Sequence, residues 1–221
     1  LYSSAASDVY KRQALGFRAG QFVWLTADRS PFSIREHPFS IASAPAARGR
    51  VEFVIKEAGD FTNRIGELPV GGPAYLDGPY GNMVLPDGPA KGVCFLAGGV
   101  GIAPILSMLR EAAARGERRP MRLVFGNRVR EQIVYGDELE AMARTLDLEI
   151  VHVLQEPPPG WRGEEGLLDE DLIRRHCGGE ERAEWLHVVC GPPVMIDSVT
   201  AALLAVGVPP GRILSEKFSY S

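Results

Sequence analysis

A continuous apolar run, Gly92–Ala97, constrains the fold more than any other feature, because it leads through a glycine-rich turn into a helix. Uninterrupted apolar strands are typical of parallel sheets, in which helices cover both faces. Strand and helix alternate four times from this run onward, which predicts a doubly wound α/β domain with a parallel sheet. The expected strands are Gly92–Ala97, Arg122–Phe125, Leu148–Leu154, Trp185–Cys190 and Ile213–Phe218, and the expected helices are Ile102–Arg115, Gly136–Thr145, Asp169–Arg175 and Val194–Val206.

The part of the chain before the proline-rich segment Pro86–Pro89 has a different pattern, made of short strands and turns. GPYG at Gly78–Gly81 is expected to end the last of these strands in a tight turn. We therefore predict a two-domain chain, with an antiparallel β-barrel at 14–88 and the α/β domain at 89–221. The expected strands of the barrel are Gln21–Ala27, Pro38–Ala42, Arg50–Lys56 and Pro73–Asp77, with a small helix near Phe61–Ile65.

Residues 1–13 (LYSSAASDVYKRQ) show no strand or helix period and lack the apolar core of a signal peptide. We interpret them as a non-native leader, with an ordinary flexible leader as the alternative. On the first interpretation the natural chain continues upstream, and the barrel is N-terminally incomplete, with exposed strand edges. No apolar run approaches the roughly 18–20 residues of a membrane-spanning helix, so the fragment itself is expected to be soluble.

Composition excludes several function classes. Lys and Arg number 24 against 28 Asp and Glu, and a net charge of −4 argues against a general nucleic-acid binder. The three cysteines, Cys94, Cys177 and Cys190, are widely spaced and form neither a disulfide framework nor a CxxC motif. The four histidines show no metal-ligand spacing either, so no metal site is expected.

Two motifs of the α/β domain lie where strands end. LAGGVGIAP at Leu96–Pro104 places three glycines between a buried strand and a helix start, where backbone N–H groups can bind phosphate. Taken alone it is also compatible with a plain tight turn. CGPP at 190–193 ends a second strand, and its alternative interpretation is a small buried cysteine beside a turn. Both motifs follow strand carboxyl ends, and together they favour a nucleotide-binding crevice.

Two motifs of the barrel are weaker when each is taken alone. The first is HPFSIAS at His37–Ser43, and the second is GDFTN at Gly59–Asn63, where a turn meets a helix start. The Thr62 hydroxyl is a candidate N-terminal cap, with nearby N–H groups free to bind a phosphate. A core role for Phe39 and a purely capping role for Thr62 are the alternatives.

The order and spacing of these motifs resemble the ferredoxin–NADP reductase superfamily, from about Ala19 to Phe218. HPFSIAS, GDFTN, DGPYG, LAGGVGIAP, FGNR, CGPP and EKF carry the resemblance. Most members have R-x-Y-S/T as the first flavin motif, whereas HPFS is similar to the ferric reductase and NADPH oxidase branch. That branch implies a haem-bearing membrane domain upstream as electron acceptor, and hence a location at the cytoplasmic face of the membrane for the full-length protein.

The resemblance also implies roles for single residues. Phe39 would lie against the isoalloxazine ring and Ser40 near the flavin N5, with Cys190 beside the nicotinamide. Phe218 would cover the other flavin face, and Glu216 is the acidic residue before it; Ser40, Cys190, Glu216 and Phe218 are the implied catalytic positions. The implied FAD-binding residues are His37, Pro38, Phe39, Ser40, Val54, Ile55, Lys56, Gly59, Phe61 and Thr62. The implied NAD(P)-binding residues are Gly98, Gly99, Gly101, Pro104, Gly126, Asn127, Arg128, Cys190, Gly191, Pro192 and Met195.

Arg128 bears on the choice of nicotinamide cofactor. A guanidinium matches the geometry of a 2′-phosphate, which favours NADPH, and a solvated loop arginine is the alternative. Arg130 offers the same two interpretations. His37 stands where most of the family has an arginine, so it carries no permanent charge for the FAD phosphates.

The expected function is that of an FAD-dependent NAD(P)H oxidoreductase module. It would pass hydride from NAD(P)H to FAD and electrons singly to haem, ferric iron or another acceptor. A soluble reductase component of an oxygenase or flavohaem system is one alternative. A nucleotide-binding regulatory module without electron transfer is another, and the presence of Ser40, Cys190 and Phe218 argues against it.

Overall fold

The computed structural model describes residues 2–3, 15–27, 37–47, 49–86, 88 and 90–216. The chain divides into two compact units, Leu1–Leu85 with Ala103–Glu111, and Pro86–Ile102 with Ala112–Ser221. Each unit holds one of the two expected kinds of sheet. The middle of one helix, 103–111, groups with the first unit.

The second unit contains a six-stranded sheet in which every strand pair is parallel. Its strand order is β11-β10-β6-β7-β8-β9, and β6, in the middle, is buried at every residue, as its apolar run predicts. This confirms the doubly wound α/β fold. The strands are β6 (Val93–Gly98), β7 (Met121–Asn127), β8 (Leu148–Leu154), β9 (Glu164–Glu165), β10 (Leu186–Cys190) and β11 (Ile213–Ser215).

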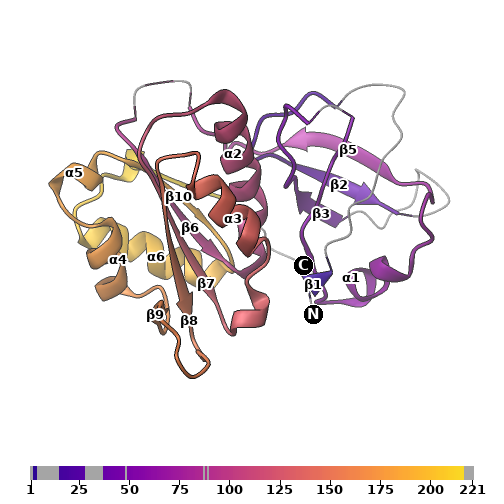
Figure 1. Ribbon diagram of the computed structural model, residues 1–221. Coiled ribbons are helices and arrows are strands. Elements are labelled where there is room, and N and C mark those ends of the chain that lie inside the picture. Colours follow the sequence, from indigo (N-terminus) through magenta and orange to yellow (C-terminus); the bar gives the residue numbers. More distant parts are fainter. Residues whose placement is uncertain are drawn as a thin grey trace. The chain divides into compact units, whose positions relative to one another are not determined.

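Helices cover this sheet on both sides. Helices α4 and α6 pack together over one face, where Leu96, Val124 and Val189 contribute to a continuous apolar core, and Figure 1 shows α3 on the other side. Asp169 caps α4 by accepting a hydrogen bond from the Leu172 N–H at 2.9 Å. The helices after β6 are α2 (Ile102–Arg115), α3 (Gly136–Ala143), α4 (Glu170–Cys177), α5 (Glu180–Ala183) and α6 (Pro193–Ala205), with single 3₁₀ turns at Gly99–Gly101, Arg130–Gln132 and Pro210–Arg212.

The first unit is antiparallel, as predicted. Its three-stranded sheet has the order β3-β2-β5, and a separate two-residue pair joins β1 to β4. Val23, Ile41 and Phe53 are buried in its apolar core. The elements are β1 (Tyr2–Ser3), β2 (Phe22–Thr26), β3 (His37–Ser40), β4 (Ile55–Lys56), α1 (Asp60–Arg64), a 3₁₀ turn at Ile65–Glu67 and β5 (Tyr75–Tyr80).

Two expectations for these strands are wrong. The strand expected over Arg50–Lys56 is reduced to β4 and one isolated bridge between Phe53 and Ile41, because the Ser43 hydroxyl, not a strand carbonyl, accepts the Glu52 N–H. The GPYG segment does not end β5, which continues to Tyr80. The pairing of β5 with β2 shifts in register between Phe22 and Trp24, and Tyr80 then pairs with Phe22.

Other differences concern short elements. Tyr2–Ser3 pairs with Ile55–Lys56, although no strand was expected in the leader. The two-residue strand β9 and the four-residue helix α5 were not predicted, because segments this short carry no periodicity. The origin of the leader stays a prediction.

A partly buried ion pair holds α2 within the first unit. The Arg110 guanidinium donates to Glu52 Oε2 at 2.6 Å and to the Ala42 carbonyl at 2.9 Å. Both side chains are largely shielded from water, with 16% and 13% of their surfaces exposed. Truncating Arg110 leaves the shielded Glu52 carboxylate with the more exposed Arg50 as its ionic partner, at 2.6 Å, and this costs more than losing a surface pair.

We expect Arg110→Ala to lower the free energy of unfolding by about 1–3 kcal/mol, measured by urea denaturation. The matched control is Arg174→Ala, which removes an exposed i,i+4 pair with Glu170 and should cost only about 0.5 kcal/mol or less. Equal losses for the two variants would contradict the prediction.

Candidate functional site

The glycine-rich turn after β6 lies against the end of β10. An ideal Cβ on Gly101 would lie 2.2 Å from the Cys190 carbonyl oxygen and 2.7 Å from the Gly191 nitrogen. Gly99 adopts φ +52°, in the left-handed region that favours glycine. Only a residue without a side chain fits at Gly101, so this turn brings backbone very close to backbone.

The turn after β10 completes the same arrangement. Ideal Cβ atoms on Gly98 and Gly191 would lie 2.2 and 2.9 Å from Met195 Sδ, so the Met195 side chain covers both glycines. Pro192 and Pro193 begin α6 directly after this turn. The structure therefore brings the LAGGVGIAP and CGPP motifs together at the carboxyl ends of neighbouring parallel strands, where ligands bind in open α/β sheets.

Cys190 is buried at this meeting point, with 4% of its surface exposed. Burial raises the pKa of its thiol to about 12, and the Glu216 carboxylate contributes in the same direction. The thiol is therefore protonated at neutral pH and is a poor nucleophile. This chemistry matches a residue that positions a ligand.

Asn127 ends the next strand, β7, at the same edge of the sheet. Only 4% of its surface is exposed, and neither Oδ1 nor Nδ2 has a hydrogen-bond partner among the described residues. An unsatisfied buried amide requires an explanation such as a ligand that the amide binds. The preceding Gly126 is tightly enclosed, since its Cβ would lie 2.4 Å from Leu168 Cδ1.

Arg128 is exposed but not free. Its Nε donates to Glu156 Oε1 at 2.9 Å, and its backbone N–H donates to Gln132 Oε1 at 3.1 Å. A 2′-phosphate would therefore meet the Glu156 carboxylate together with the guanidinium. Glu156 was not predicted as a site residue, although an acidic residue just after a strand end was a usable signal.

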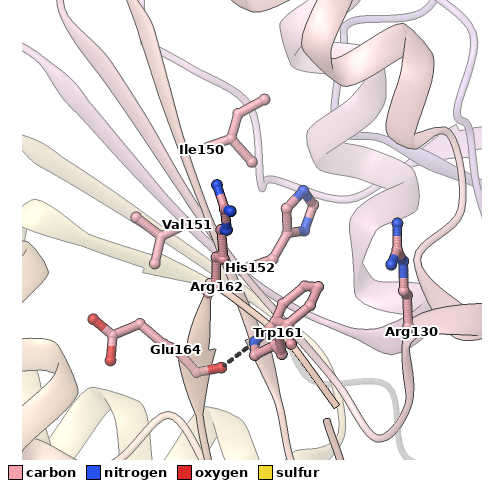
Figure 2. A pocket seen from close by; sticks show the side chains of 9 residues that line it. Arg130, Ile150, Val151, His152, Trp161, Arg162 and Glu164 are labelled. Atoms are coloured by element: carbon pink, nitrogen blue, oxygen red, sulfur yellow. Dashed lines mark hydrogen bonds between the residues drawn. The ribbon is translucent and has the colours of Figure 1, made fainter. Parts of the chain in front are cut away.

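Arg130 lines a cavity of about 640 Å³ along β8, the strand next to the edge strand β9 (Figure 2). Trp161 Nε1 donates to the Glu164 carbonyl at 3.0 Å on its wall, and burial lowers the pKa of the His152 imidazole. The lining residues are Arg130, Ile150, Val151, His152, Gly160, Trp161, Arg162, Gly163 and Glu164.

In the first unit, β3 and α1 bring their aromatic rings together. The His37 ring stacks on Phe61 with centroids 4.2 Å apart, and the Phe39 ring lies 6.1 Å from Phe61. Pro38 and Ser40 lie on the same strand and, like His37 and Phe39, are half-buried. The HPFSIAS and GDFTN motifs therefore meet, which leaves a half-exposed aromatic surface.

The cap expected from Thr62 is wrong. Thr62 lies inside α1, and the N-cap is Gly59, which has no side chain. The Thr62 hydroxyl accepts from the Ala58 N–H at 2.9 Å and donates to the Gly59 carbonyl at 3.1 Å, so it stabilises the turn before the helix.

The remaining implied residues are distributed as follows. Val54 and Ile55 are buried, Lys56 is exposed, and Pro104 lies in the first turn of α2. Glu216 follows β11 directly. Phe218 lies outside the described residues, so its role stays a prediction.

Comparison with known families yields two matches on one chain. An oxidoreductase FAD-binding domain matches residues 8–85, and an oxidoreductase NAD-binding domain matches residues 95–201. In the described part of the chain, each helix is too short or too polar to cross a membrane.

Among curated proteins, the reductase component of propane 2-monooxygenase from Mycolicibacterium goodii is 32% identical over 212 residues, which cover 92% of this chain and 59% of that protein. NADH-cytochrome b5 reductase 1 from Laccaria bicolor is 27% identical over 212 residues, which cover 94% of this chain and 68% of that protein. The chain thus spans less than two thirds of the propane 2-monooxygenase reductase components that it matches, at 56–62% of their length.

Solved structures share the fold. The ferredoxin reductase in carbazole 1,9a-dioxygenase superposes with a TM-score of 0.83 at 23% identity, covering 99% of this chain and 67% of that one. A ferredoxin NADP+ reductase from Neisseria gonorrhoeae with bound FAD and NADP gives a TM-score of 0.73 at 24% identity, covering 90% and 86%.

Proposed function

Because the chain belongs to the ferredoxin–NADP reductase superfamily, we propose that it is an FAD-dependent NAD(P)H reductase module. The observation that carries the proposal is that one chain holds both an FAD-binding and an NAD-binding domain. FAD, when bound, accepts hydride from a nicotinamide and releases the electrons singly. The protein supplies binding, orientation and hydrogen bonds for this chemistry.

The second unit has residues that fit a nicotinamide dinucleotide. Gly98 and Gly101 allow the backbone to approach a pyrophosphate closely, and the Asn127 amide, which has no partner in the described part of the chain, offers both a donor and an acceptor to the ribose. Cys190, as a buried neutral thiol, would orient the nicotinamide without reacting with it.

The first unit has residues that fit a flavin. Phe39 and Phe61 present half-buried rings against which the flavin would lie, and Ser40 offers a hydroxyl on the same strand. His37 contributes its imidazole as a stacked ring. The Thr62 hydroxyl bonds its own turn, so it would shape the pyrophosphate site instead of donating to it directly.

For the electron acceptor, we propose a partner protein of an oxygenase system. The support is that the propane 2-monooxygenase relative is a reductase component and that the carbazole 1,9a-dioxygenase structure is a ferredoxin reductase. These relatives favour a separate redox partner over the membrane haem domain that the HPFS motif implies.

Anaerobic titration tests the proposed function. The purified chain is loaded with FAD, and NADH or NADPH is added stepwise while the flavin absorption band is recorded. We expect full bleaching with about one equivalent of the better donor. A chain that retains FAD and is bleached by neither nucleotide would refute the proposal.

The Arg128–Glu156 pair predicts a change in nucleotide preference. Glu156→Gln removes the carboxylate that opposes a 2′-phosphate and frees the guanidinium of Arg128. We expect the ratio of kcat/KM for NADPH to that for NADH to rise about tenfold, equivalent to about 1.4 kcal/mol. The control, Glu181→Gln, changes an exposed carboxylate on α5 and should leave the ratio unaltered.

A further inference from the structure

We propose that Cys94, Cys177 and His187 form a binding site for one thiophilic cation, Zn²⁺ or Cu⁺, remote from the nucleotide motifs. The three ligand atoms, two Sγ and one imidazole nitrogen, all lie within 4.8 Å of one another. Thiolate and imidazole are ligand types that both ions bind.

The parallel sheet creates this cluster. His187 on β10 is the register partner of Cys94 on β6, so the two side chains point to the same face of adjacent strands. Helix α4 covers that face, and its last residue, Cys177, brings its Sγ to 3.2 Å from Cys94 Sγ. Figure 1 shows α4 beside these strands. Because the ligands come from three elements, their sequence spacing gives no metal signature.

His187 is the observation that points to a ligand rather than to ordinary core packing. All three residues have 0% of their surface exposed. The His187 Nδ1 lies 3.1 Å from the Trp185 carbonyl oxygen, and in the tautomer that donates to this oxygen the lone pair is on Nε2. Nε2 is buried and has no hydrogen-bond partner among the described residues. A bound ion would satisfy this orphaned acceptor.

Metal binding requires deprotonated ligands. The ion binds a neutral imidazole and two thiolates, so each thiol must lose its proton as the ion binds. The hydrogen bond with Cys177 and burial raise the pKa of Cys94, while the charges of Arg122 and Arg182 oppose the rise. Ion binding replaces the S–H bonds of Cys94 and Cys177 by two metal–sulfur bonds and releases two protons.

The charge around the cluster tolerates either ion. Zn²⁺ with two thiolates is neutral, and Cu⁺ leaves one negative charge near two guanidiniums. Arg122, the next residue in the same row across the sheet, donates to the His176 carbonyl at 2.5 Å and pairs with Glu149. The bond from Arg122 to the His176 carbonyl therefore holds the C-terminal end of α4 beside the cluster.

The position of the cluster indicates a structural role. Cys94 and His187 are the second residues of β6 and β10, whereas the two glycine turns follow the other ends of these strands. An ion there would join the end of α4 to two strands without contacting the proposed nucleotide site.

Metal binding to the purified chain tests the proposal. The protein is stripped of metal under reducing, anaerobic conditions and titrated separately with Zn²⁺ and with Cu⁺ against a chromophoric chelator. We expect about one equivalent of one ion, two protons released per ion, and a higher melting temperature. The arm with the tighter binding identifies the ion.

Two variants and one control define the site. Cys177→Ala and His187→Ala should each weaken binding at least about tenfold, a loss typical of removing a ligand or its support. Cys190→Ala removes the third buried thiol, which lies outside the cluster, and should retain the affinity. If one variant fails to fold, the other still decides.

Equal affinity in wild type and a folded cluster variant would overturn the proposal, as would binding of neither ion. A Cys94–Cys177 disulfide that persists under reducing conditions would also overturn it. None of these readouts depends on flavin reduction, so the proposed reductase activity is tested separately.

Discussion

Gly101→Ala is expected to destabilise the second unit by about 3 kcal/mol or more and to abolish flavin reduction by either nucleotide. Gly101 has φ −61° and ψ −8°, a conformation that alanine also adopts, so the effect is entirely steric. The added Cβ would lie 2.2 Å from the Cys190 carbonyl oxygen. That atom belongs to the backbone of β10 and cannot rotate away, so the two turns must separate.

Thermal and urea denaturation followed by circular dichroism measure this loss. Gly211→Ala is the control, because nothing lies within 4 Å of its Cβ and its φ is not positive, and it should leave stability within about 0.5 kcal/mol of wild type. Gly98→Ala makes an informative comparison, since its Cβ meets the flexible Met195 side chain. Met195→Ala should restore the stability lost in Gly98→Ala but not the stability lost in Gly101→Ala. If it restored both, backbone contact would not be the cause of the loss in Gly101→Ala.

Ser40→Ala is expected to slow flavin reduction about 100-fold, while the chain still binds FAD. We propose that the Ser40 hydroxyl donates a hydrogen bond near the flavin N5, and loss of one positioned donor typically costs about 10²–10³ in rate. Alignment for hydride transfer is similarly sensitive to small displacements. Anaerobic stopped-flow measurement of a single turnover isolates this step from electron transfer to the acceptor.

The control for this prediction is Ser198→Ala on α6, whose hydroxyl is exposed and donates to the Met195 carbonyl within its own helix. Its rate should equal that of wild type. An unchanged reduction rate in Ser40→Ala, at equal FAD occupancy, would remove Ser40 from the proposed mechanism.

Local patterns predicted most of the α/β unit. Helix Ile102–Arg115 and strand Leu148–Leu154 have the bounds expected from the sequence, because their apolar residues follow the period of the element that they form. Patterning was less informative in the antiparallel unit. There a side-chain hydroxyl, Ser43, competes with strand pairing at Glu52, and a register shift extends β5.

The sequence by itself determined the two kinds of sheet, the order of their elements and the glycine turns at strand ends, since burial, helix periodicity and glycine conformation are properties of short segments. Only the tertiary structure decided which distant side chains meet. Cys94 lies 83 residues from Cys177, and Arg128 lies 28 residues from Glu156. Their contacts depend on the strand order and register of the parallel sheet, which set the alignment of elements across long loops and leave no trace in local spacing.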